Sequence, residues 1–260
     1  MIKDEKEIAI LLPNKEDYSK EKAAAAAIWV KDFNRGAFAK KTIIFGNAKS
    51  LPYLSKNFFN LKTLSYINNS FFYLRTFVKK LSKKTKIIEI HNRPHFFFIL
   101  KKKFPNIKFI LVFHNDPNLL KGSKFIDEKL KILENCDEII FASSYIKDRF
   151  YYNLKNILKL KGKVIYPSSN YYNHNFSKKI KKQKIIIFVG KLNSSKGYHL
   201  FGEAVIKVLN KYKNWKAIIA GNEKRESYNF SHKRIKFYNW ISHNKIINFY
   251  KKSSISIRSE

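Results

Sequence analysis

The 260-residue sequence predicts an α/β protein built from two modules, each with a doubly wound parallel sheet. Short apolar runs rich in β-branched residues alternate with helical stretches along the whole chain. Strands that are joined by crossover helices pair in parallel with right-handed connections. Apolar runs without polar interruption, such as residues 185–189, indicate strands covered by helices on both faces. We therefore expect two Rossmann-like modules.

The first module is expected to span residues 1–166. Its expected strands are residues 8–12, 42–45, 62–67, 86–90, 107–113, 138–142 and 163–166. Its expected helices are residues 20–33, 70–81, 95–103, 124–134 and one that follows residue 143. Pro94 suits the first turn of a helix, and Ser143 is a good N-cap residue.

The second module is expected to span residues 184–260, after a polar, basic linker at residues 167–183. Its expected strands are residues 185–189, 216–220, 235–238 and 254–257, and its expected helices are residues 196–212 and 243–251. The sequence stops just after a strand, where a functional loop is expected in a doubly wound fold. We therefore expect the second module to be incomplete.

The chain is strongly basic, with 53 Lys and Arg against 19 Asp and Glu, a formal charge of +34. The lysines are spread from end to end, and only seven of the 53 cations are Arg, the usual reader of base edges. This distribution favours a solvated basic surface. A basic face for an anionic membrane or a polyanionic substrate stays open, and so does nucleic-acid binding, but no specific nucleic-acid partner is expected.

The cysteine count and the apolar runs exclude several classes of protein. A single cysteine, Cys136, excludes a disulfide framework and a Cys-based zinc site, and fits a reducing compartment. The charged start is unlike a signal peptide, and no apolar run approaches the ~18 residues of a membrane-spanning helix. We expect a cytoplasmic protein, with peripheral contact to the inner face of the membrane as an open alternative.

A turn with two glycines and two lysines follows the strand at 185–189 and opens the next helix. Gly190, Lys191, Lys196 and Gly197 lie in this turn. Backbone N–H groups at a helix start, together with two ammonium groups, suit a phosphate or diphosphate. The order Lys-Gly is not that of a Walker A loop. The alternative is a tight strand-to-helix turn with two solvated lysines.

Two strand ends of the first module carry a His-Asn pair. His91 and Asn92 follow one expected strand, and His114, Asn115 and Asp116 follow the next. Because parallel strands end at one edge of a sheet, these residues are expected to lie together at a crevice. The alternative is that each histidine only forms loop hydrogen bonds. No third ligand lies at a suitable spacing and no Asp-x-Asp occurs, so we expect no metal site.

Two further strand ends lie in the second module. Gly221 follows the expected strand at 216–220, and Trp240 and Ile241 follow the one at 235–238. These residues could cradle a flat ring such as a nucleotide base. The alternative is that they are part of the core.

On these residues the chain resembles the family-4 (group 1) glycosyltransferases, which have the two-module GT-B fold. The strongest match is Gly190-Lys191-Leu192 with Lys196-Gly197, which is similar to the family's Gly-Arg-Leu and Lys-Gly. The other matching segments are residues 90–91, 113–114, 137–144, 217–221, 238–250 and 253–259. The resemblance covers almost the whole chain.

The resemblance implies transfer of a sugar from a nucleotide-sugar donor to a glycan or lipid-linked acceptor, with retention and without metal or other cofactor. It implies that Lys191 and Lys196 hold the donor diphosphate and that His114 lies near the reacting sugar. Lys191 stands where the family has Arg, and Asn239 where it has Gly. The family's paired-Glu segment would fall beyond residue 260, so a truncated chain is expected. A non-catalytic nucleotide-sugar-binding module is the alternative, followed by a basic nucleic-acid-binding protein.

Overall fold

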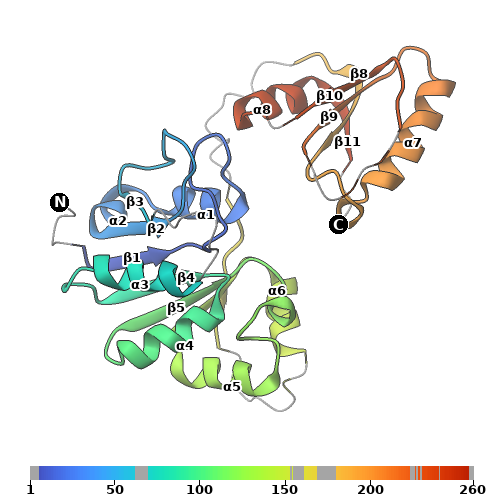
Figure 1. Ribbon diagram of the computed structural model, residues 1–260. Coiled ribbons are helices and arrows are strands. Elements are labelled where there is room, and N and C mark those ends of the chain that lie inside the picture. The colour runs from blue at the N-terminus through green and yellow to red at the C-terminus, as the bar shows by residue number, and fades with distance from the viewer. Residues whose placement is uncertain are drawn as a thin grey trace. The chain divides into compact units, whose positions relative to one another are not determined.

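The computed structural model describes residues 6–61, 70–152, 154, 161–168, 180–222, 226, 228, 230–239 and 241–257. The chain divides into two compact units, Met1–Tyr171 and Tyr172–Glu260 (Figure 1). Each unit is an α/β structure with one parallel sheet. The two-module α/β fold expected from the sequence is thereby confirmed.

The first unit contains a seven-stranded sheet in the order β3-β2-β1-β4-β5-β6-β7, and its pairings are parallel throughout. The strands are β1 (Ile8–Leu11), β2 (Thr42–Gly46), β3 (Phe58–Asn60), β4 (Ile87–His91), β5 (Lys108–Phe113), β6 (Glu138–Phe141) and β7 (Lys163–Val164). The strand order reverses between β1 and β4. In doubly wound sheets, ligands bind outside the carboxyl ends of the strands at this point.

Helices cover both faces of this sheet (Figure 1). They are α1 (Ala25–Phe33), α2 (Gly36–Lys41), α3 (Ser70–Lys80), α4 (Pro94–Lys103), α5 (Ile126–Asn135) and α6 (Ser144–Tyr151), with a short 3₁₀ turn, η1 (Pro117–Leu119). Pro94 is the first residue of α4. The Ser143 hydroxyl accepts a hydrogen bond from the Ile146 N–H at 3.3 Å, which confirms the expected cap.

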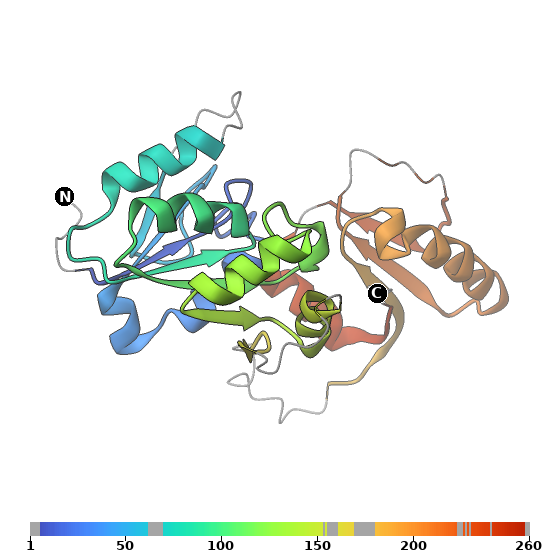
Figure 2. The same cartoon turned by 90° about the horizontal axis from the view of Figure 1, so that it is seen from below.

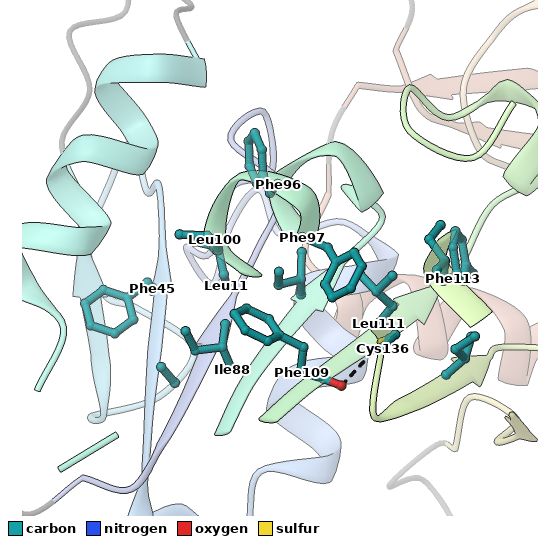
Figure 3. Close-up of a cluster of buried hydrophobic side chains, with 14 of the residues drawn as sticks. Leu11, Phe45, Ile88, Phe96, Phe97, Leu100, Phe109, Leu111, Phe113 and Cys136 are labelled. Carbon is teal, nitrogen blue, oxygen red and sulfur yellow. Dashed lines mark hydrogen bonds between the residues drawn. The ribbon is translucent and has the colours of Figure 1, made fainter. Parts of the chain in front are cut away.

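Alternate residues of the strands build two separate cores. Ala9 and Leu11 of β1 pack under α3 to α6, whereas Ile10 of β1 and the next residue after the strand, Leu12, pack under α1. The first core is rich in phenylalanine and includes the buried Cys136, whose Sγ donates to the Phe109 carbonyl at 3.3 Å (Figure 3). Because successive strand residues point to opposite faces, both faces of this sheet are apolar and buried.

The second unit contains a four-stranded parallel sheet in the order β10-β9-β8-β11. Its strands are β8 (Gln183–Val189), β9 (Lys216–Ala220), β10 (Ile235–Tyr238) and β11 (Ser253–Ile257), and its helices are the 3₁₀ turn η3 (Ser194–Lys196), α7 (Tyr198–Lys211) and α8 (His243–Lys252). Phe201 and Val205 of α7 pack on Ile186 and Phe188 of β8. The strand order again reverses at the first strand, between β8 and β11.

Several boundaries differ from the sequence-based predictions. Helix α1 begins at Ala25 and not at residue 20, because Asp17 and Ser19 form bridges with Asn47 and Tyr53. Strand β3 and helix α2 were not expected. The strand expected at 62–67 lies outside the described residues, and so do residues 169–179 of the expected linker.

Candidate functional site

Two imidazoles meet at the carboxyl edge of the first sheet. His91 is the last residue of β4, and His114 directly follows β5, the neighbouring parallel strand. Nδ1 of His91 lies 2.8 Å from Nε2 of His114, and the two rings are within 14° of parallel. The expectation that the two strand-end histidines lie together is met.

A buried carboxylate continues this chain of hydrogen bonds into the sheet. Glu89 Oε1 lies 2.7 Å from Nε2 of His91, and both residues are buried. A carboxylate oxygen only accepts hydrogen bonds, so in a neutral His91 ring the proton lies on Nε2. Nδ1 of His91 then accepts the Nε2–H of His114. The Nδ1 lone pair of His114 remains as the outer, accepting end of the chain.

Burial keeps His114 neutral. Desolvation, followed by the effect of neighbouring His91, lowers the pKa of His114 from its usual 6.5 to about 3. A buried imidazole loses more hydration when charged than when neutral, which is why its pKa falls. At neutral pH, His114 can therefore accept a hydrogen bond from a hydroxyl group at Nδ1 but carries no positive charge.

Asn92 fixes the backbone that follows β5. Its own backbone is left-handed, with φ of +50°, which asparagine tolerates better than most residues. Its Oδ1 accepts the backbone N–H groups of His114 at 2.8 Å and Asn115 at 3.2 Å. Its Nδ2 donates to Asn115 Oδ1 at 3.3 Å. Asn92 thus joins the two strand ends.

Trp29 of α1 closes the inner side of the two imidazoles. Its ring meets those of His91 and His114 edge-on, with centroid distances of 5.4 and 5.3 Å. Only 6% of Trp29 is exposed, and its indole N–H has no hydrogen-bond partner within the described part of the chain. An unpaired buried donor costs about 1–3 kcal/mol. Because this N–H is itself buried, Trp29 acts here through the packing of its ring against the imidazoles.

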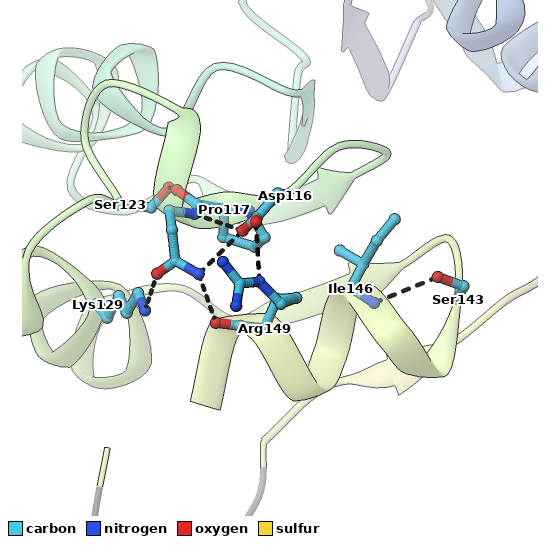
Figure 4. Close-up of polar contacts among 8 residues, drawn as sticks. Asp116, Pro117, Ser123, Lys129, Ser143, Ile146 and Arg149 are labelled. Carbon is cyan, nitrogen blue, oxygen red and sulfur yellow. Dashed lines mark hydrogen bonds and ion pairs between the residues drawn. The ribbon is translucent and has the colours of Figure 1, made fainter. Parts of the chain in front are cut away.

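Asp116 has structural partners in the neighbouring loop (Figure 4). Its carboxylate accepts hydrogen bonds from Arg149 Nε at 2.9 Å and from the Asn118 N–H at 2.9 Å. Asn118 in turn accepts a hydrogen bond from Lys129 Nζ at 2.7 Å. These bonds and Arg149 lower the pKa of Asp116 in spite of partial desolvation. The hydrogen bonds of Asp116 and Asn118 connect η1 to α5 and α6, so the Asp116 carboxylate stabilises the loop that contains Asn115.

In the second unit, the glycine- and lysine-containing turn follows β8, as the sequence predicts. Gly197 lies between η3 and α7 with φ of +59°, a left-handed conformation that favours glycine. Lys191 and Lys196 are both exposed. The Ser194 N–H donates to the Glu226 carboxylate at 2.7 Å, so this turn already attracts an anionic group. Such a turn is chemically suited to a phosphate.

Gly190 and Gly221, predicted for the diphosphate and the base, lie against each other. A Cβ on Gly221 would be 1.7 Å from the carbonyl oxygen of Gly190, so no larger residue fits at Gly221. Ile241 is half-buried between β10 and α8, and Trp240 lies outside the described residues. Thus the carboxyl ends of β8 and β9 form one small backbone platform next to the two lysines. That this turn and His114 serve one ligand stays a prediction.

Part of this chain is similar in sequence to known glycosyltransferases. Residues 172–259 match the family model for Glycosyl transferases group 1. The matched residues contain the turn at 190–197. The chain is also similar to a protein of Bacillus subtilis (strain 168) named "Putative glycosyltransferase YtcC", with 26% identity over 152 residues. This alignment spans 53% of the present chain and 37% of the length of the Bacillus protein.

Solved structures share the fold over nearly the whole chain. Anabaena Alr3699/HepE, crystallised in complex with UDP and glucose, superposes with a TM-score of 0.63 at 11% identity, covering 98% of this chain and 74% of that one. A glycosyltransferase from Rickettsia africae ESF-5 gives a TM-score of 0.62 at 18% identity, covering 98% and 73%. At these identities the likeness establishes the fold.

Sequence reasoning missed Glu89 and Trp29. The signal for Glu89 is present in the sequence, because it is a charged residue within an apolar strand, two positions before His91 and thus on the same face. Trp29 gives no such signal, since its contact with the histidines depends on how α1 packs on the sheet.

The described residues contain neither a helix that could span a membrane nor a cluster of metal-ligating side chains. No helix there is both long and apolar enough to cross a bilayer. No three His, Cys, Asp or Glu side chains there converge as metal ligands would.

Proposed function

We propose that the protein is a glycosyltransferase that moves a sugar from a nucleotide-sugar donor to a glycan or lipid-linked acceptor. The observation that carries this proposal is the match of residues 172–259 to the group 1 family, over the unit that holds the turn at 190–197. The shared fold with a structure in complex with UDP and glucose supports it. The resemblance to family-4 enzymes further carries the proposals of retention, of a metal-independent reaction and of a cytoplasmic location.

The donor diphosphate is assigned to the second unit. The ammonium groups of Lys191 and Lys196 bind its phosphate oxygens, together with backbone N–H groups of the turn. In the reaction, the acceptor oxygen bonds to the anomeric carbon while the bond from that carbon to the diphosphate breaks, and where the acceptor is a hydroxyl its proton passes to the departing diphosphate. The electron pair of the broken bond leaves with the diphosphate, whose added negative charge the lysines stabilise. Ile241, Gly221 and Trp240 are assigned to the base.

The imidazole pair is assigned to the sugar. His114 Nδ1 accepts a hydrogen bond from a sugar hydroxyl and so fixes the sugar relative to the acceptor, a positioning effect. Glu89 and His91 hold His114 in the tautomer that leaves Nδ1 free to accept. His91, Asn92, Asn115 and Asp116 shape the acceptor side of this edge.

The direct test is release of nucleoside diphosphate from UDP-, GDP- and dTDP-sugars by the full chain. We expect one donor to be consumed and His114→Asn to lower the rate at least ~100-fold. The matched control is Lys213→Ala, which replaces an exposed lysine two residues beyond the end of α7 and should change nothing. Binding of nucleotide without turnover of any sugar would indicate a non-catalytic binding module. No binding at all would refute the proposal.

Glu89→Gln tests the positioning role separately. The glutamine can still bond to His91, but it removes the charge that selects the His91 tautomer. We expect kcat to fall about tenfold with KM for the donor unchanged, and the acidic limb of the pH–rate profile to shift. A purely structural role for Glu89 would lower thermal stability without moving the pH profile.

A further inference from the structure

A cavity of about 820 Å³ opens in the first unit between α3 and α4. These two helices run side by side on one face of the sheet (Figure 2). The lining is apolar along its length, with Phe71, Leu74 and Val78 from α3 and Ile99 and Leu100 from α4. Phe71 is 63% exposed and Ile99 is 54% exposed. A volume of this size suits one small ligand and not an extended protein surface.

Cations surround this apolar cavity. The lining contains no carboxylate, but it contains six cationic side chains: Lys15, Arg75, Lys79, Arg93, Lys103 and Lys121. Within the described part of the chain, none of the six forms an ion pair with Asp or Glu. The ligand that complements this site has an apolar body and several negative charges.

One end of the cavity is held rigidly next to the histidine pair. Arg93 donates to the Asn92 carbonyl at 2.8 Å and to Asn14 Oδ1 at 3.4 Å. The Lys121 carbonyl accepts the His95 N–H at 3.2 Å. Gly122 lets that loop pack closely, because a Cβ there would lie 2.5 Å from the His95 nitrogen. The Arg93 guanidinium is therefore fixed by hydrogen bonds, one of them to the Asn92 carbonyl, and the backbone of Lys121 is held beside it.

We propose that this cavity binds a single phosphorylated lipid. Its hydrocarbon chain lies between α3 and α4 against Phe71, Val78 and Ile99. Its phosphate or diphosphate lies at Arg93 and Lys121, at the sheet edge. This proposal deepens the proposed function, on which the lipid's role as sugar acceptor rests. The binding step itself makes and breaks no covalent bond.

Other anionic ligands fit the site less well. Inorganic phosphate would leave the apolar lining exposed to water. A flat anionic membrane surface would be attracted by lysines anywhere on this chain and would not require a concave apolar site. For a lipid, each methylene that enters the cavity strengthens binding about fourfold.

The test is calorimetric titration of the full chain with farnesyl phosphate below its critical micelle concentration. Farnesol, which lacks the phosphate, and inorganic phosphate, which lacks the chain, are the ligand controls. We expect saturable binding of farnesyl phosphate, with each control ligand at least ~30-fold weaker. Equally tight binding of inorganic phosphate, or of farnesol, would overturn the proposal.

A matched pair of variants locates the site. Lys15→Glu with Lys121→Glu reverses two lining charges at the sheet-edge end of the cavity, and Lys20→Glu with Lys124→Glu reverses two exposed charges outside the lining. We expect the first pair to raise Kd at least tenfold and the second to raise it less than twofold. Equal effects would mean general charge attraction, as for a membrane surface, and would overturn the proposal.

A parallel titration with UDP separates the two proposals. The cavity variants should bind UDP as the unaltered protein does. Lipid binding without any donor use would refute the proposed function and leave the lipid site. Donor turnover without farnesyl phosphate binding would refute the lipid site alone.

Discussion

Replacement of His114 by asparagine should make the first unit less sensitive to acid. The pKa of His114 is lowered from 6.5 to about 3 in the folded protein, chiefly by burial. Below pH 6.5 the unfolded chain binds a proton at this residue that the folded chain does not bind. Protonation therefore stabilises the unfolded state, and the folding stability falls as the pH falls from 7 towards 3.

The magnitude follows from the two pKa values. At pH 5 the imidazole of the unfolded chain is almost fully protonated, while that of the folded chain is almost fully neutral. The free energy of unfolding should therefore be about 2 kcal/mol lower at pH 5 than at pH 7 because of this residue alone. A folded-state pKa one unit higher or lower leaves this difference almost unchanged, which makes pH 5 the informative condition.

The assay is urea unfolding at pH 7 and pH 5, followed by the fluorescence of Trp29. Trp215 and Trp240 are replaced by phenylalanine so that Trp29 is the sole reporter. Asn in place of His114 can still donate to His91 but does not titrate. We expect the variant to lose about 2 kcal/mol less between the two pH values than the chain with His114. Equal losses would show that His114 is not held neutral, and would refute the tautomer argument.

Three further predictions concern single residues. Gly221→Ala should destabilise the second unit by about 3 kcal/mol in urea unfolding, because the new Cβ would lie 1.7 Å from the Gly190 carbonyl oxygen. The control, Gly190→Ala, should cost less than about 1 kcal/mol, because its Cβ would meet only a phenylalanine ring atom at 3.9 Å. Similar costs for the two variants would contradict the close packing at Gly221. Lys196→Ala should raise the Kd for UDP about tenfold in calorimetry, whereas Lys213→Ala should leave it unchanged. Equal effects of the two variants would contradict the claim that the turn at 190–197 binds the diphosphate. Burial raises the pKa of Cys136 to about 12, so its thiol stays protonated and inaccessible in the folded chain. Ellman's reagent at pH 8 should therefore label Cys136 only in urea. Prompt labelling of the folded chain would contradict this burial.

Most of the fold can be predicted from the sequence because the first sheet is buried on both faces and the inner strand of the second sheet is also largely apolar. The apolar runs in β5 and β8 are nearly continuous, that of β4 is interrupted only at Glu89, and the structure places these three strands within two residues of the expected bounds. Helix α2 could not be predicted in this way. It has six residues and none of them is buried, so no apolar stripe marks it.

The contacts of the candidate site also fall into those that the sequence predicts and those that depend on tertiary packing. The contact between His91 and His114 could be predicted, since adjacent parallel strands end at one edge. The edge contacts of Trp29 could not, because they depend on tertiary packing of α1. The Asp116–Arg149 pair joins residues 33 positions apart and has no local signal. Sequence reasoning therefore found the strand ends but not the side chains that hold them.

The most direct test of the central claim is calorimetric titration of the full chain with UDP, GDP and dTDP. The account predicts saturable one-to-one binding of at least one of these, and its loss in the Lys191→Ala, Lys196→Ala double variant. Absence of heat with all three nucleotides, or unchanged affinity in the double variant, would contradict the claim that this protein uses a nucleotide-sugar donor.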